Sequence, residues 1–194
     1  MKRTIEQKKQ EILNVAIKLF AEKGYEGTTM ADIAKQANVG FGTVATYYDS
    51  KENLLLKCVE EPMESFKKAI LNFNPAPTNY DQELTEMTYQ HFKIFHDHRL
   101  YLLLLIHITA QWEKYFQPFL IANQAARELS ERLEVLIGNG QSDGVIPSGD
   151  ANNLANTYIS TLLGLFLSNT DRFSDQALAM YAMHAKRLFG LQLQ

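Results

Sequence analysis

Apolar residues recur at helical spacing along most of the chain. Ile12, Ala16, Leu19 and Phe20 fall on one helical face, and Gly24 follows where a left-handed residue commonly ends a helix. Further patterns of the same period predict helices through Ile33 and Ala34, over Phe41–Tyr48, from Lys51 onward, and over Tyr80–His96, Arg99–Trp112, Pro118–Gly138, Ala151–Ser168 and Asp175–Phe189. Because no segment alternates as a strand does, the pattern predicts an all-α fold.

Turn signals divide this series of helices. Thr28 or Thr29 is a suitable N-cap for the short second helix, and Asn38-Val39-Gly40 breaks the chain before the third. Asp49 or Ser50 precedes the fourth helix, in which Pro62 predicts a kink and a place for motion. We expect an N-terminal domain over residues 1–50 and a larger helical domain over residues 51–194.

The stretch Thr29–Tyr48 has the pattern of two short helices around a tight turn. Ala34 is small where the helices would cross, and Val39 and Val44 would pack inward. The second helix then leaves its other side chains pointing outward, namely Phe41, Thr43, Thr46 and Tyr47. Hydroxyls can bond base edges or phosphates and rings can meet thymine methyls, so the pattern fits a helix-turn-helix that reads DNA. An ordinary corner in a helical bundle fits the same spacing.

Composition narrows the function classes. Of 194 residues, 46% are hydrophobic and 21% charged, as in ordinary globular proteins. Cysteine occurs once, at Cys58, which argues against a disulfide framework and for a reducing compartment. Residues 1–11 are polar, and the apolar run Leu100–Ile108 is too short to span a bilayer, so we expect a cytoplasmic protein without membrane contact.

Charge is distributed unevenly although the net charge is only −3. Residues 1–57 hold nine Lys/Arg against seven Asp/Glu, whereas the remaining residues hold ten against fifteen. A mildly positive N-terminal part permits phosphate contact, which needs only a few well-placed cations.

An unbroken register of motifs runs through residues 10–57: Leu19-Phe20-Ala21-Glu22-Lys23-Gly24-Tyr25, Thr28-Thr29-Met30-Ala31-Asp32-Ile33-Ala34, Ala37-Asn38-Val39, Gly42-Thr43-Val44, Tyr47-Tyr48 and Ser50-Lys51-Glu52-Asn53-Leu54. With these motifs, the stretch resembles the N-terminal domain of the TetR family of bacterial repressors. The resemblance implies a three-helix DNA-binding head, joined by a linker helix to a helical ligand-binding and dimerisation domain.

The resemblance also implies roles for single residues. The helix Phe41–Tyr48 would enter the major groove, Tyr48 would pack beneath it, and Lys51 would bind a phosphate. The DNA-contacting set so predicted is Thr28, Thr29, Phe41, Gly42, Thr43, Thr46, Tyr47 and Lys51. Many members have Ser-Lys where this chain has Gly40-Phe41, and many have tyrosine at the position of Ala45. A basic arm could compensate, although a solvated tail is the plainer interpretation of its residues Lys2, Arg3, Lys8 and Lys9.

Such heads usually read palindromic operators as two-fold dimers. We expect the helices Pro118–Gly138 and Ala151–Ser168 to form the dimer face through Ala122, Ala126, Leu129, Leu133, Leu154, Tyr158, Leu162 and Phe166. The middle helices would enclose a small apolar or amphipathic effector, with candidate walls at Phe92, Phe95, Tyr101, Leu104, His107, Trp112, Phe116 and Tyr158. Each of these side chains is also an ordinary core residue by type. Some members of the family respond to fatty acyl-CoA, and the leucine-rich run 100–108 would suit an acyl chain.

Other function classes find less support in the sequence. The histidines at 91, 96, 98 and 107 lack carboxylate or thiolate partners at ligand spacing, so we expect neither a metal nor a cofactor. We find no nucleophile motif and no phosphate-binding glycine loop, and therefore expect no enzyme. A helical protein–protein adaptor remains an alternative to a ligand-responsive repressor.

Overall fold

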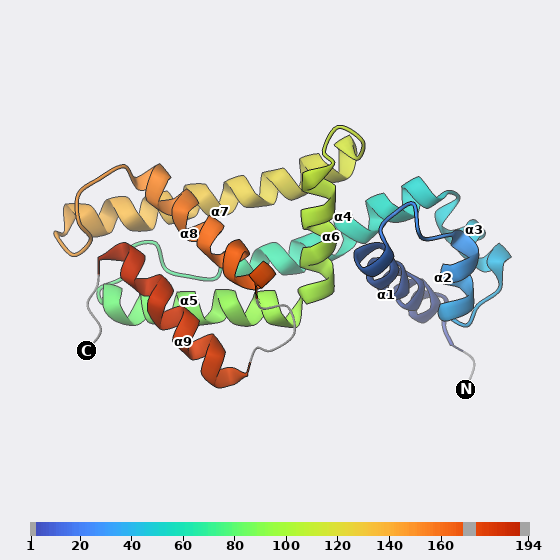
Figure 1. Ribbon diagram of the computed structural model, residues 1–194, viewed down its shortest axis with the longest axis horizontal. Helices are drawn as coiled ribbons and strands as arrows, with labels where there is room; N and C mark the ends of the chain where they lie inside the picture. Colours follow the sequence, from blue (N-terminus) through green and yellow to red (C-terminus); the bar gives the residue numbers. More distant parts are fainter. Residues whose placement is uncertain (1–2, 169–173, 191–194) are drawn as a thin grey trace. The chain divides into compact units, whose positions relative to one another are not determined.

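The computed structural model describes residues 3–168 and 174–190, and all regular structure within them is helical (Figure 1). The helices in chain order are α1 (Ile5–Lys23), α2 (Met30–Gln36), α3 (Phe41–Tyr48), α4 (Lys51–Ile70), α5 (Tyr80–Asp97), α6 (Arg99–Ala110), α7 (Phe116–Ser142), α8 (Ala151–Ser168), α9 (Asp175–Lys186) and the 3-10 helix η1 (Arg187–Phe189). The all-α prediction is confirmed.

The helices form two compact units. The first contains Met1–Ser65 and Arg99–Gln124, and the second contains Phe66–His98 and Ala125–Gln194. Helices α4 and α7 contribute residues to both units. The first unit therefore holds more than the head that we expected over residues 1–50, and the division within α4 falls shortly after Pro62.

Local capping explains where the first helices begin. Thr4 caps α1 and Thr29 caps α2 through reciprocal capping boxes with Gln7 and Asp32. In each box the hydroxyl oxygen accepts a hydrogen bond from a backbone N–H of the first turn, and the partner side chain accepts one from the cap residue. Of the two candidate caps before α2, Thr29 is thus the one used.

Helix α7 departs from the predicted boundaries. It begins at Phe116 rather than Pro118 and continues through Gly138 and Gly140 to Ser142. Gly140 serves close packing instead of termination, because a Cβ there would lie 2.6 Å from Ile146 Cδ1 and 3.1 Å from Tyr80 Cε1. The chain reverses at Gly144, whose φ of +71° suits glycine.

The other end-point differences are smaller. Helix α6 stops at Ala110 rather than Trp112, and the last predicted helix tightens into η1 after Lys186. Gly190, with φ +79°, follows η1 as a left-handed residue.

The first unit has its core where α1, α2, α3 and α4 meet. Ile12, Ile33, Val44, Leu54 and Val59 are each fully buried. Helical periodicity places each of these apolar residues on the inner face of its helix. The pattern in the sequence therefore accounts for this core.

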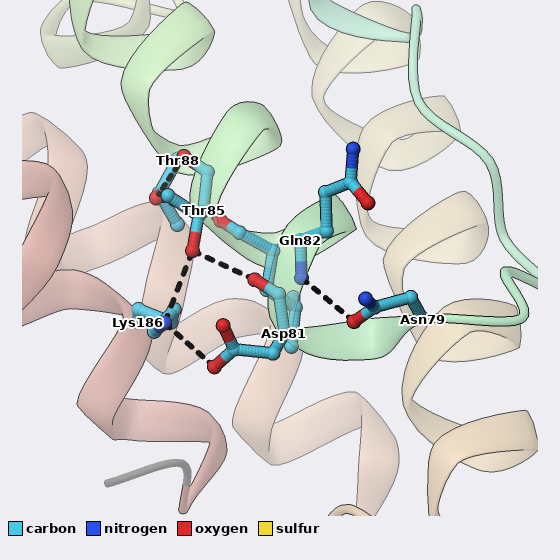
Figure 2. Close-up of polar contacts among 7 residues, drawn as sticks. Asn79, Asp81, Gln82, Thr85, Thr88 and Lys186 are labelled. Carbon is cyan, nitrogen blue, oxygen red and sulfur yellow. Dashed lines mark hydrogen bonds and ion pairs between the residues drawn. The ribbon is translucent and has the colours of Figure 1, made fainter. Parts of the chain in front are cut away.

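The second unit packs α5 against α8 and α9. Leu84, Phe92, Tyr158 and Phe189 are almost fully buried in it. A polar link joins α9 to α5: the Nζ of Lys186 donates hydrogen bonds to Asp81 Oδ1 at 2.7 Å and to Thr85 Oγ1 at 3.0 Å (Figure 2). Lys186 is only 8% exposed, so its charge requires this partner.

Candidate nucleic-acid interface

Helix α3 divides into a buried and an open face. Val44 and Tyr48 are buried in the first unit, and the Tyr48 hydroxyl donates a hydrogen bond to the Lys9 carbonyl at 3.0 Å. Phe41, Gly42 and Thr46 are exposed, while Thr43 and Tyr47 are half-buried. The prediction that Tyr48 packs in the core is confirmed, and the five predicted contact residues of α3 are all solvent-accessible.

The turn before α3 fixes where that open face points. Asn38 has a φ of +51°, a left-handed conformation that asparagine tolerates better than most residues. The Val39 N–H then donates a hydrogen bond back to the Ala34 carbonyl at 3.0 Å. The chain thus closes α2 tightly and starts α3 two residues later, at Phe41.

Thr28 is misplaced in the predicted contact set. Its side chain is fully buried, and its hydroxyl donates to the carbonyls of Gly24 at 2.9 Å and Leu19 at 3.2 Å. A buried hydroxyl needs such partners, and burial removes it from any approaching duplex. The threonine therefore closes the loop between α1 and α2.

Thr29 stays exposed at the start of α2, although its hydroxyl is engaged in the capping box. The same hydrogen bonds lower the pKa of the Asp32 carboxyl, which keeps a negative charge at this helix end. A backbone phosphate approaching Thr29 would have to come near that charge.

Lys51 has a structural role that the sequence did not indicate. Its Nζ donates hydrogen bonds to the carbonyls of Tyr25 at 3.0 Å and Thr28 at 3.1 Å, and lies 4.0 Å from the centre of the Tyr25 ring. An ammonium has three donor hydrogens, so one remains for a phosphate. The predicted phosphate contact stays a prediction.

The loop that Lys51 holds is fixed from a second side. The Tyr25 hydroxyl donates to Glu52 Oε1 at 2.6 Å. Burial, together with this hydrogen bond, raises the pKa of the Tyr25 phenol, and the same hydrogen bond lowers the pKa of the Glu52 carboxyl. The Nζ of Lys114 pairs with Glu26 at 2.5 Å, and the Tyr25 and Tyr115 rings meet edge to face. None of these loop contacts follows a helical period, so the spacing of apolar residues in the sequence could not predict them.

The basic arm is partly docked. The Arg3 guanidinium pairs with Glu11 and donates to the carbonyls of Ala37 and Asn38. The Nζ of Lys9 lies 5.8 Å from the centre of the Tyr47 ring. Lys2 lies outside the described residues.

Comparisons with known proteins find a family that is similar to this helix-turn-helix. The model for bacterial regulatory proteins of the tetR family matches residues 12–58. The similarity to the tetR family lies in the N-terminal helices of the chain. As the resemblance in the sequence indicated, the match covers the described helices α2 and α3 and parts of α1 and α4.

Curated relatives share mainly this region. Over 58 residues the chain is 43% identical to IcaR, a negative transcriptional regulator of the biofilm operon icaADBC in Staphylococcus epidermidis, covering 30% of this chain and 31% of that protein. Over 94 residues it is 30% identical to the fatty acid metabolism regulator protein of Bacillus subtilis, covering 48% of each. The matched stretch spans less than half of either relative. Both of these relatives are named as regulators.

Solved structures extend the likeness in fold. A tetR-family regulatory protein from Rhodococcus RHA1 matches with a TM-score of 0.77 at 23% identity, over 94% of this chain and 97% of that one. PfmR from Thermus thermophilus matches with a TM-score of 0.71 at 18% identity, over 94% and 99%. The predicted architecture, an N-terminal helix-turn-helix followed by a larger helical part, is confirmed.

The predicted effector walls are distributed between the two units. Phe92, Phe95 and Tyr158 belong to the second unit and are buried in its core. The first unit holds the others, Tyr101, Leu104, His107, Trp112 and Phe116. Leu104 and His107 line a cavity of about 200 Å³ beside Tyr25, and Phe116 lines a cleft of about 840 Å³ around Lys51 and Lys114.

Several predicted walls are engaged elsewhere. The Tyr101 hydroxyl donates to the Val59 carbonyl at 2.7 Å. Trp112 and Phe116 are about half exposed, so they do not line a closed pocket. The eight residues as a set therefore stay a prediction for the effector site.

The predicted dimer residues need correction. Leu129, Leu133, Tyr158, Leu162 and Phe166 are each at most 4% exposed within their own protomer. Because the interior of one chain already buries them, they are not available to a second copy. Ala122 is also buried, whereas Ala126 is exposed and Leu154 half-buried. The periodicity thus identified apolar faces correctly, but it assigned the buried residues to the wrong partner, while Ala126 and Leu154 stay a prediction.

The second unit contains a buried polar pair that the sequence analysis did not predict. Both nitrogens of the fully buried His91 ring are engaged, Nε2 with the Ile70 carbonyl at 2.7 Å and Nδ1 with the Tyr158 hydroxyl at 2.9 Å. Since a carbonyl only accepts, Nε2 carries the proton and Nδ1 accepts from the tyrosine. Burial lowers the pKa of His91 to about 4.

Two further observations concern metal sites and membrane-spanning helices. Among the described residues, no three His, Cys, Asp or Glu side chains gather closely enough to hold a metal ion. No helix in that part of the chain is both long and apolar enough to cross a membrane.

Proposed function

We propose that the chain is a sequence-specific transcriptional regulator that binds double-stranded DNA through α3. The observation that carries this proposal is the division of α3 into a buried face and an open one, within a tetR-family domain. Val44 and Tyr48 hold the helix, and the open side offers a ring, a glycine and hydroxyls to the major groove.

Thr46 carries a more specific expectation. Its hydroxyl donates to the Gly42 carbonyl at 2.6 Å, so its oxygen is free only to accept. In the major groove the donors are the amino groups of adenine and cytosine, and thymine offers a methyl group to the threonine methyl. We therefore propose that Thr46 selects among these bases.

The test is selection of duplexes from a randomised pool by the purified protein. The proposal expects enrichment of a palindromic sequence, because a two-fold dimer reads two equal half-sites. Thr46→Val keeps the methyl group and loses the acceptor, so it is expected to relax the preference at one position per half-site, with a cost of about 1–3 kcal/mol per contact. Enrichment of no sequence would contradict the proposal and favour the helical adaptor instead.

We further propose that the protein is a homodimeric repressor that a small apolar or amphipathic effector releases from DNA. Support for repression is the similarity to IcaR, which is named a negative regulator. The effector would bind one state of the dimer more tightly and shift the population away from DNA.

A fatty acyl-CoA is one candidate effector. The observation that favours it is the similarity to the fatty acid metabolism regulator protein of Bacillus subtilis, which reaches past the head to 48% of each chain. Release of the selected duplex by palmitoyl-CoA, and not by free coenzyme A, would support this choice.

A further inference from the structure

Arg3 is the point where the N-terminal segment meets the helix-turn-helix. Its Nη1 donates a hydrogen bond to the Ala37 carbonyl at 3.2 Å, and its Nη2 donates one to the Asn38 carbonyl at 2.6 Å. The same guanidinium pairs with Glu11 on α1. The side chain is 34% exposed, so these contacts are partly shielded from water.

The two carbonyls lie where α2 ends and the turn begins. Carbonyls of a last helical turn lack partners within the helix, and a cation near them is favourable. Asn38 is also the residue with positive φ that redirects the chain toward α3. The guanidinium thus ties the bend between the two helices to α1 through Glu11.

A second contact holds the other end of α3. There the Tyr48 hydroxyl donates to the Lys9 carbonyl at 3.0 Å. Residues 3–11 therefore fix α3 at its entry, through Arg3 and Glu11, and at its exit, through Lys9.

We propose that Arg3 is a positioning residue for DNA binding, which holds the turn between α2 and α3 so that the open face of α3 keeps the orientation that reads the duplex. This inference rests on the proposed DNA-binding function. It differs from a basic arm that touches phosphates, because three of the five guanidinium donors are bonded to the protein's own carbonyls and to Glu11.

The test measures binding of the full chain to the duplex that the wild type selects and to a scrambled duplex of equal composition, at several salt concentrations. Arg3→Ala is compared with Lys18→Ala. The control removes one positive charge from an exposed position on α1, the helix that also carries Glu11. The inference expects Arg3→Ala to bind the selected duplex about tenfold more weakly, in keeping with the loss of two charge-assisted hydrogen bonds. The scrambled duplex should lose much less, because it does not depend on the orientation of α3.

The salt dependence separates positioning from phosphate contact. A residue that does not touch DNA releases no counterion, so the slope of log affinity against log salt should match that of Lys18→Ala. A slope smaller by about one unit would overturn the inference and make Arg3 a phosphate ligand. Equal affinity of Arg3→Ala and Lys18→Ala for the selected duplex would also overturn it.

Separate controls distinguish a loss of folding stability, and a failure of the proposed DNA-binding function, from a failure of this inference. Thermal unfolding of each variant shows whether the fold persists at the assay temperature. Arg3→Lys keeps the charge and reaches fewer acceptors, so it should bind between the wild type and the alanine variant, and it carries the test if the alanine variant unfolds. A wild type that selects no sequence would overturn the DNA-binding proposal itself, whereas wild-type binding that Arg3→Ala matches would overturn only this inference.

Discussion

At the scale of single residues, His91 makes the second unit sensitive to acid. Its ring is neutral in the fully buried site, and its pKa of about 4 lies below the ordinary histidine value of 6.5. The unfolded chain binds a proton near pH 6.5 and the folded chain does so only near pH 4. The contribution of His91 to stability is therefore complete above pH 6.5 and is lost as the pH falls toward 4.

The expected loss over that window is roughly 3 kcal/mol. Chemical unfolding at a series of pH values would measure it, with His91→Gln as the test variant and the exposed His107→Gln as its control. The free energy of unfolding should fall between pH 6.5 and about 4 more steeply in the wild type than in His91→Gln. A His91→Gln profile parallel to the wild type would show that another group titrates.

The residues on the open face of α3 could be predicted from the sequence. Helical periodicity identifies the positions that are buried, and the remaining positions form the open face. Residues that act through loops cannot be predicted in this way. Thr28 and Lys51 are far apart in the sequence, yet the Lys51 Nζ reaches the Thr28 carbonyl at 3.1 Å. Only the path of the loop between α1 and α2 brings them together, and helical periodicity carries no information about that path.

At the scale of elements, the two glycines of α7 provide a matched pair. A Cβ on Gly138 meets nothing within 4 Å, whereas a Cβ on Gly140 would lie 2.6 Å from Ile146 Cδ1. Gly138→Ala should therefore stabilise the protein by about 0.5–1 kcal/mol, through the better helix propensity of alanine. Gly140→Ala should destabilise it by about 1–3 kcal/mol, because the neighbouring side chains must shift.

Thermal unfolding of the two variants tests both the expected stabilisation by Gly138→Ala and the expected destabilisation by Gly140→Ala. If Gly140→Ala were as stable as the wild type, the loop that carries Ile146 would have to shift without any loss of folding free energy, and the expected destabilisation would be wrong. Glycine's propensity alone predicted the end of α7 at this point, and the prediction failed because the packing of Ile146 and Tyr80 is a tertiary feature. Where a helix boundary depends on a local signal, the sequence came within one residue, since it offered Thr28 or Thr29 as the cap of α2 and Thr29 is the one used.

At the scale of the whole molecule, the sequence predicted the fold class and the similarity of the N-terminal helices to the tetR family, because both depend on a long register of helices and caps. The assignment of surfaces was harder. An apolar helix face looks the same whether its partner is another helix of the chain or a second copy, and α8 shows the consequence: Leu162 and Phe166 are buried within the protomer.

The proposed dimer would therefore use apolar side chains that remain exposed. In the second unit, Leu167 on α8 and Met180 and Met183 on α9 are 40–48% exposed, and α8 and α9 contact each other. Val135 on α7 is 53% exposed and lies on the helix that the sequence analysis favoured. The two α9 methionines are three residues apart and share one helical face, which gives α9 the more continuous apolar surface.

If the chain forms the proposed dimer, we expect Met180→Glu to dissociate it, because the substitution places a charge in a surface that must become dry, and Val135→Glu to leave it intact. Light scattering after gel filtration measures both masses, and binding to the selected duplex reports the consequence. A monomeric Met180→Glu should retain only the weaker binding of a single head, since one head reads one half-site. Dissociation by Val135→Glu alone would instead assign the dimer face to α7.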